Sequence, residues 1–128
     1  MAETTYVQDG ETLDWINNTG GAVAAKDVVV IGTNGDAVIG IALVDMANGA
    51  TGAVTVSGVH EVPKVDAAVI AVGEFVIWDS SAGKFDDNAA TPASGDVSGG
   101  AWAIESKGAT TDATIKVKLS GVPSLLTA

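Results

Sequence analysis

The segment Ala113-Thr-Ile-Lys-Val-Lys-Leu119 alternates apolar and polar side chains without interruption. Every second side chain is apolar, which places Ile115, Val117 and Leu119 on one face of an extended chain. The opposite face then carries Thr114 and two lysines. This period of two is typical of a β-strand with one buried and one solvated side. The segment therefore predicts an all-β fold.

Three further segments carry strand patterns. Residues 54–57 repeat the alternation, which continues to Val62 until Pro63 removes a backbone donor. Residues 28–31 and 75–78 are unbroken apolar runs, which suit strands covered on both faces. One segment instead has helical spacing, because Val65, Ala68, Val69 and Val72 would share a face over two turns ending at Gly73. We therefore expect at most one short helix.

Turn residues separate these segments. Asn34-Gly35 is the pair whose positive φ angles fit a two-residue hairpin after the first apolar run. Residues 79–83 predict a longer turn before Lys84 and Phe85. Residues 86–99 are rich in Asp, Asn, Ala, Ser, Pro and Gly, and we expect them to form a long exposed loop.

The two halves of the chain share an order of features. Residues 27–59 contain an apolar strand, a turn, a strand opening with Gly40, an acidic end at Asp45, a Gly-Ala-Thr turn and a strand closing on Ser-Gly-Val. Residues 74–122 repeat that order, with Glu105 at the acidic end. This order predicts an internal three-strand repeat, and hence a small β-barrel or β-sandwich with pseudo-symmetry.

The length of 128 residues predicts one domain with one core. We expect residues 15–122 to form this single β domain. Residues 1–14 lack a partner segment nearby and are expected to form an extended N-terminal arm, and residues 123–128 a C-terminal tail. An extended arm of this kind can add a strand to another chain.

Composition argues against several classes of partner. The chain has a formal net charge of −10, no arginine and no cysteine, so phosphate binding, disulfides and thiolate metal sites are not expected. No apolar run approaches the length of a membrane helix, and the acidic residues 1–14 do not resemble a signal peptide. We therefore expect neither nucleic acid nor a membrane as a partner.

Few residues predict chemistry. His60 is the one imidazole, and it lies on a strand with no nucleophile motif around it. Asp45 and Glu105 occupy equivalent places in the two repeats, where they are either paired acids, a hard-cation site or solvated strand ends. The cluster Asp86-Asp87-Asn88 lacks the ligand spacing of a calcium loop. The sequence therefore predicts no catalytic residue, no cofactor and no metal site.

The three tryptophans have two interpretations. They form either a sugar-stacking platform or anchors in a core or an oligomer interface. Because strands surround Trp15, Trp78 and Trp102, the second interpretation is favoured.

Three segments together resemble the small decoration, or cement, proteins of tailed-phage capsids, a family long catalogued as a domain of unknown function. They are Gly58-Val-His-Glu-Val-Pro-Lys64, Gly73-Glu-Phe-Val-Ile-Trp-Asp-Ser-Ser-Ala-Gly-Lys-Phe85 and Ala101-Trp-Ala-Ile-Glu105, which leads to the strand 113–119. The resemblance extends from Tyr6 to Leu119. It implies a β-tulip fold, no enzymatic residues, and a homotrimer on the outer surface of the virion capsid that clamps adjacent major capsid subunits.

The resemblance also implies contacts between the N-terminal arm and the capsid. Within residues 1–10 these contacts map to Thr4, Thr5, Tyr6 and Val7. A compact acidic β domain with a free arm suits a protein that binds many identical sites at once. The alternatives are a carbohydrate- or receptor-binding β module on the virion surface and a small hydrolase using Asp45 and Glu105.

Overall fold

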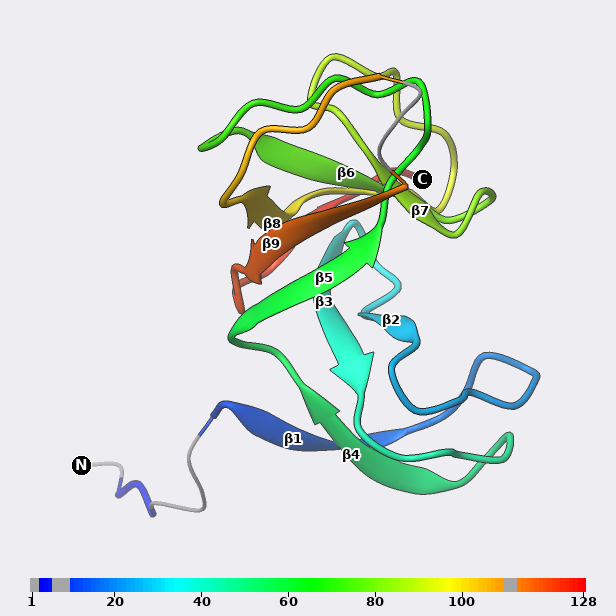
Figure 1. The fold of residues 1–128 in the computed structure, drawn as a ribbon. Helices are drawn as coiled ribbons and strands as arrows, with labels where there is room; N and C mark the ends of the chain where they lie inside the picture. The colour runs from blue at the N-terminus through cyan, green and yellow to red at the C-terminus, as the bar shows by residue number, and fades with distance from the viewer. Residues whose placement is uncertain (1–2, 6–9, 110–112) are drawn as a thin grey trace.

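The computed structural model describes residues 3–5, 10–109 and 113–128. These residues form ten β-strands and no helix, and every strand pairing is antiparallel (Figure 1). The strands are β1 (Thr12–Ile16), β2 (Val28–Ile31), β3 (Asp36–Ala42), β4 (Thr51–Thr55), β5 (Val59–Pro63), β6 (Phe75–Asp79), β7 (Lys84–Asp86), β8 (Val97–Ala103), β9 (Thr114–Leu119) and β10 (Ser124–Leu126). The predicted all-β class is confirmed. No helix in the described ranges has the length and apolarity needed to span a membrane.

The ten strands form one hydrogen-bonded sheet that does not close. Its main path is β1-β4-β3-β10-β8-β6-β7, while β2 pairs with β3, and β9 joins β8 to β5. The strands at the ends of the path, β1 and β7, each pair with one strand among the described residues. The structure is therefore an open sheet and not the closed barrel that the sequence suggested.

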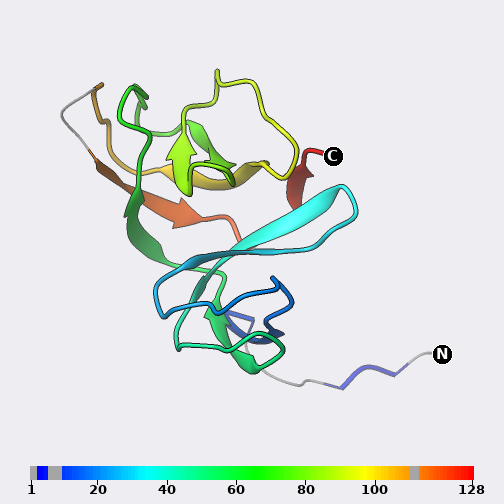
Figure 2. The same ribbon diagram turned by 90° about the vertical axis from the view of Figure 1, so that its right-hand side faces the viewer.

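The short strand β10 connects the two halves of the sheet. Leu125 pairs with Asp36 of β3 on one side and with Ser98 of β8 on the other. Figure 2 shows β10, in red, beside β3, in cyan. The sheet thus extends into the segment expected to be a tail, and at the other end β1 begins at Thr12, inside the expected arm. Neither strand has an alternating pattern long enough to be recognised in the sequence.

The two halves use similar strand pairings. In the first half β3 pairs with β2 and β4, and β4 also pairs with β1. In the second half β8 pairs with β6 and β9, and β9 also pairs with β5. The two halves also share single hydrogen bonds. The N–H of Lys26 donates to the carbonyl of Ala42 in the first half, and the N–H of Gly73 donates to the carbonyl of Ala103 in the second. β7 and the loop after it are inserted into the second half only.

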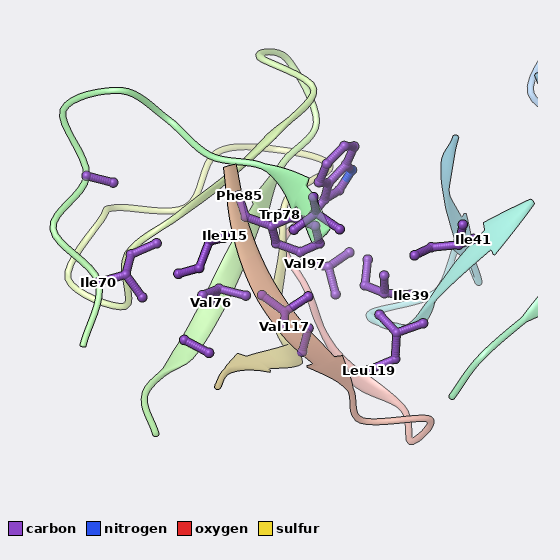
Figure 3. Packing of buried hydrophobic residues seen from close by; sticks show 14 of the residues in the cluster. Ile39, Ile41, Ile70, Val76, Trp78, Phe85, Val97, Ile115, Val117 and Leu119 are labelled. Atoms are coloured by element: carbon purple, nitrogen blue, oxygen red, sulfur yellow. The ribbon is translucent and has the colours of Figure 1, made fainter. Parts of the chain in front are cut away.

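Two hydrophobic clusters stabilise the fold. The larger one lies mainly within the second half and includes the inward side chains of β9, Ile115, Val117 and Leu119 (Figure 3). The alternation predicted for this strand is confirmed, since Lys116 and Lys118 are exposed. The smaller cluster lies between β1, β2 and β4, and its members are Trp15, Val23, Val29, Ala42, Met46 and Val54. Such burial contributes roughly 25 cal/mol per Å² of apolar surface.

The helix suggested for residues 65–73 is absent, and that prediction is wrong. The segment forms two tight turns and a single bridge between Ile70 and Lys107. The reason lies in Lys64, whose ammonium is completely buried and donates to the carbonyls of Val65, Asp66 and Ala68. Carbonyls that converge on one ammonium are not aligned along a common helix axis, and the carbonyl of Val65 accepts the N–H of Ala68 in a tight turn and not that of residue 69 in a helix.

The two-residue hairpin predicted at Asn34-Gly35 is also wrong. Ile31 pairs with Val38, so the connection between β2 and β3 is longer, and Gly35 but not Asn34 has a positive φ. The longer loop provides a docking point, since the N–H of Leu126 donates to the carbonyl of Gly35.

The loop expected over residues 86–99 is shorter than predicted. Strand β8 begins at Val97, and Asp96 is buried. The carboxylate of Asp96 accepts hydrogen bonds from the backbone of Ser80 and Ala93, which ties this loop to the turn after β6. The predicted turn over residues 79–83 is confirmed, and it ends with Gly83 donating to the carbonyl of Asp79.

Candidate functional site

One exposed row of side chains crosses four strands of the second half. Phe75 of β6 lies opposite Trp102 of β8, Trp102 opposite Lys118 of β9, and Lys118 opposite Val59 of β5. Directly paired residues share one face of a sheet, so the four side chains stand side by side. We call this row, Val59, Phe75, Trp102 and Lys118, the aromatic face.

The aromatic face is apolar and exposed. The exposed fraction is 53% for Val59, 45% for Phe75 and 40% for Trp102. Trp102 projects outward because Ala101 and Ala103, its neighbours on β8, point into the core. Large apolar side chains in register on one sheet are more informative than scattered ones, because contiguous exposed apolar surface marks interaction sites.

Lysines give this face a local positive charge. Lys118 lies within the row, and Lys116 is exposed two residues earlier on the same strand and therefore on the same face. The residue opposite Lys116 is Glu61, whose carboxylate accepts a hydrogen bond from the hydroxyl of Thr114. In a chain with a net charge of −10, two neighbouring exposed lysines make this face electrostatically distinct.

The residue pair of the first half that corresponds to Phe75 and Trp102 is covered. Val28 lies opposite Ile41 across β2 and β3, as Phe75 lies opposite Trp102 across β6 and β8. Ile41 is a buried member of the larger cluster, and Val28 is partly buried against it. The first half therefore covers its pair of Val28 and Ile41, while the equivalent pair of the second half, Phe75 and Trp102, stays partly exposed.

The other two tryptophans lie in the core. Trp15 belongs to the smaller cluster and Trp78 to the larger one, where its ring lies 5.0 Å from that of Phe85. The three tryptophans thus do not form a common platform for a sugar, and Trp102 is the exposed one.

The residues expected to contact a capsid lie at the N-terminal end. Thr4 and Thr5 are exposed and belong to no strand. Tyr6 and Val7 lie outside the described residues.

The acidic residues singled out in the sequence bind nearby backbone. Asp45 accepts a hydrogen bond of 2.8 Å from the N–H of Ala25, and Glu105 accepts one of 3.0 Å from Lys116. The carboxylate of Glu105 also lies 3.9 Å from the ammonium of Lys107. Within the described ranges no three His, Asp or Glu side chains form a group able to hold a metal ion.

The remaining candidate groups are also used locally. His60 Nε2, on β5, lies 2.9 Å from the carbonyl of Ser57 in the bend that precedes this strand. Asp86 and Asp87 accept hydrogen bonds from the N–H groups of Asp87 and Ala89. A cleft of about 440 Å³ runs beside β2, and its lining includes Val28, Val30, Pro63, Trp78, Lys26 and Asp27. The hydrogen bonds of His60, Asp86 and Asp87 thus stabilise the local backbone, as those of structural residues do.

Two features of the site were not predicted from sequence. The apolar run 75–78 predicts a buried Phe75, whereas its side chain is 45% exposed. The alternation of β9 predicts that Lys116 and Lys118 are exposed, but not that they lie beside exposed aromatic side chains. The alternation Ala101-Trp-Ala103 was the available signal, because small residues on both sides of a tryptophan indicate that its ring projects from the opposite face.

Comparison with known families identifies one match. A family model described as phage cement protein matches residues 7–119, a range that includes every strand except β10. Comparison with curated proteins and with solved structures gives no match. Because the matched range covers most of the chain, the similarity concerns both halves of the sheet, without β10. The chain therefore belongs to the phage cement protein family, a family of structural proteins located on the capsid surface of the virion.

Proposed function

We propose that this protein is a non-enzymatic cement protein that binds the outside of the mature phage head and stabilises contacts between major capsid subunits. The observation that carries the proposal is the family match over residues 7–119, since that family binds the phage capsid. The role then belongs to the whole folded sheet and its surfaces, and not to a catalytic site.

The physical chemistry of the chain suits this role. A protein that binds an assembled lattice more tightly than a loosened one stabilises the lattice by mass action. Modest contacts suffice for each copy when many copies bind one shell. The net charge of −10 keeps a surface present in many copies soluble.

We also propose that the N-terminal arm contacts the capsid. Thr4 and Thr5 are exposed and unpaired with any strand, as a segment available to another chain would be. Together with Tyr6 and Val7 they form a short sequence rich in β-favouring residues, which suits the addition of a strand to an exposed sheet edge.

The protein is further proposed to act as a homotrimer with a β-tulip type of architecture. The similar pairings of β2-β3-β4-β1 and β6-β8-β9-β5 support a duplicated unit, extending the proposed three-strand repeat by one strand. In a trimer such a unit presents six related sheet faces, which suits attachment at symmetric positions of a shell.

The test is to add purified protein to heads that lack it. We expect saturable binding with a copy number near that of the major capsid protein, measured by quantitative mass spectrometry. Decorated heads should also release their DNA at a higher temperature than bare heads. Binding of only a few copies per head, or an unchanged release temperature, would contradict the proposed cement role.

A further inference from the structure

Among the described residues, Phe75 and Trp102 of the aromatic face stay partly exposed, while the equivalent pair of the first half, Val28 and Ile41, packs in the larger cluster. Burying the exposed part of these apolar side chains is favourable, so a partner that covers the row gains binding energy. Aromatic side chains near the centre of an apolar patch are also the residues that most often dominate binding.

The charges of the aromatic face favour an acidic partner. Lys118, which lies opposite the uncharged Val59, would repel the Lys118 of a second aromatic face, which argues against two copies meeting through the same surface. The chain itself is strongly acidic, and Lys26 is the one lysine that precedes Lys64. The first half of another copy therefore has the complementary charge.

A suitable acidic surface exists at the opposite end of the molecule. On β1, Asp14 and Ile16 share the face that points away from the smaller cluster, because Trp15 between them points into it. Leu43 adjoins them, since its N–H donates to the carbonyl of Ala53, the residue opposite Asp14. Ile16 and Leu43 are 59% and 48% exposed. We call Asp14, Ile16 and Leu43 the β1 face.

We propose that the aromatic face of one copy packs against the β1 face of the next, so that copies associate head to tail. The apolar side chains of Phe75 and Trp102 then cover Ile16 and Leu43, and the ammonium of Lys118 lies near the carboxylate of Asp14. No lysine is present on β1, β3 or β4, so nothing on those strands repels Lys118. A head-to-tail contact of this kind closes into a ring when its rotation allows.

This inference rests on the homotrimer proposed above and adds the surfaces that form it. The two ends are well separated along the sheet, since β1 is its first strand and β6 lies near its last (Figure 1). One copy can therefore present both faces to two different neighbours.

Cysteine cross-linking tests the proposal directly, because the chain has no native cysteine. The single variants Ile16→Cys and Phe75→Cys are prepared separately, mixed on heads, and treated with a short bismaleimide. We expect a cross-linked dimer from the mixture and only background from either variant alone. The matched control replaces Phe75→Cys with Ala82→Cys, an exposed position in the turn between β6 and β7, and should give background with Ile16→Cys.

The other outcomes separate the two proposals. A dimer from Phe75→Cys alone would indicate that like faces meet, and a cross-link from Phe75→Cys to the major capsid protein would indicate that the shell covers this face. Either result overturns the head-to-tail contact. If the mixture gives no dimer while an amine-reactive cross-linker still gives trimers, the assigned surfaces are wrong and the trimer stands. If no reagent gives oligomers, both fail.

Charge reversal gives an independent measurement. We expect Lys118→Glu and Asp14→Lys each to weaken self-association about tenfold, because each places like charges opposite one another. The double variant should recover most of the loss, since it restores opposite charges. Lys84→Glu is the control outside both faces and should leave association unchanged. Unchanged association of Lys118→Glu would overturn the charge argument, provided that circular dichroism shows the native fold.

Discussion

The ammonium of Lys64 and the side-chain amide of Asn17 occupy corresponding places in the two halves of the sheet. Each residue directly follows a strand, β5 or β1, and each side chain is completely buried. Lys64 Nζ donates to three backbone carbonyls at 2.6–3.2 Å, and Asn17 Nδ2 lies 2.8–3.3 Å from three others. In both halves, therefore, one buried side-chain nitrogen donates to backbone carbonyls of irregular segments beside the strand: residues 65–68 for Lys64, and Gly21, Met46 and Ala47 for Asn17.

We predict that Lys64→Met destabilises the protein by about 2 kcal/mol, because three backbone carbonyls lose the ammonium as a donor and the hydrogen bond to Ala68 is buried. Methionine keeps most of the side-chain volume, so the loss reports hydrogen bonding and not a cavity. Urea unfolding measures the free energy. The control Lys84→Met removes a half-exposed lysine 4.0 Å from Asp66 and should change stability by less than about 1 kcal/mol. Equal losses would show that Lys64 is not a structural donor.

Strong local patterns made part of the fold predictable. The strand 113–119, the apolar run at Val28–Ile31 and the turn over residues 79–83 are determined by neighbouring side chains, and the structure has them where the sequence placed them. The helix over residues 65–73 and the hairpin at Asn34-Gly35 failed because hydrogen bonds that hydrophobic periodicity and turn preferences do not reveal decide those backbones. In the segment 65–73, the buried ammonium of Lys64 binds backbone carbonyls of the residues that directly follow it. In the loop at Asn34-Gly35, the carbonyl of Gly35 accepts a hydrogen bond from the N–H of Leu126 in β10.

The candidate site was less predictable than the fold. The register that brings Phe75, Trp102, Lys118 and Val59 into one row joins four strands that are distant in sequence. Pairing of this kind depends on chain topology, which local periodicity does not encode. Burial of Trp15 and Trp78 and exposure of Trp102 depend likewise on which face of each strand meets the core.

Lys26 has a left-handed backbone with φ of 77°, while the corresponding residue of the second half is Gly73 with φ of 90°. A side chain in this region costs about 1–2 kcal/mol, which glycine avoids. We predict that Gly73→Lys destabilises the protein by at least about 1 kcal/mol. Lys26→Gly should range from no change to about 1 kcal/mol of stabilisation, since the greater freedom of unfolded glycine offsets part of the gain. Thermal unfolding of both variants measures the change in stability relative to the native chain. Destabilisation by Lys26→Gly would contradict the predicted cost of the left-handed backbone.

Deletion of residues 1–10 should weaken attachment to heads while leaving the sheet intact, because β1 begins at Thr12. We expect an unchanged circular dichroism spectrum and lower occupancy of heads at a fixed protein concentration. The double substitution Thr4→Gly and Thr5→Gly should give a smaller loss in the same direction, since glycine disfavours strand formation. Full occupancy by the deletion variant would rule out contact through the arm.

The pKa of Asp79 is held below its usual range, first by the hydroxyl of Ser81 and then by the N–H groups of Ala82 and Ser81. A carboxyl whose pKa is lowered by folding adds stability above its unfolded pKa, which is about 3.9, and loses it as the pH falls through the folded value. We predict that Asp79→Ala destabilises the protein at pH 7 and that the difference from the native chain shrinks below about pH 4. Urea unfolding over this pH range measures it, and a difference independent of pH would contradict the assignment.

Gly100 of β8 allows Ile39 of β3 to pack closely between the two halves. A Cβ placed at Gly100 would clash with Cγ1 of Ile39, a completely buried side chain with little room to move. We predict that Gly100→Ala costs about 1–3 kcal/mol, the range expected for overpacking a core. Because φ of Gly100 is not positive, the loss reflects the contact and not the backbone.

The second variant Ile39→Ala tests that contact, because alanine lacks the Cγ1 atom that the new Cβ at Gly100 would meet. Combined with Gly100→Ala it should cost less than the sum of the two single changes, since both alter one contact. Gly21→Ala is the control, because a Cβ there has no neighbour within 4 Å and φ is not positive. It should stay within about 0.5 kcal/mol of the native chain. Strictly additive losses at Gly100 and Ile39 would show that the two residues do not share the junction between the halves.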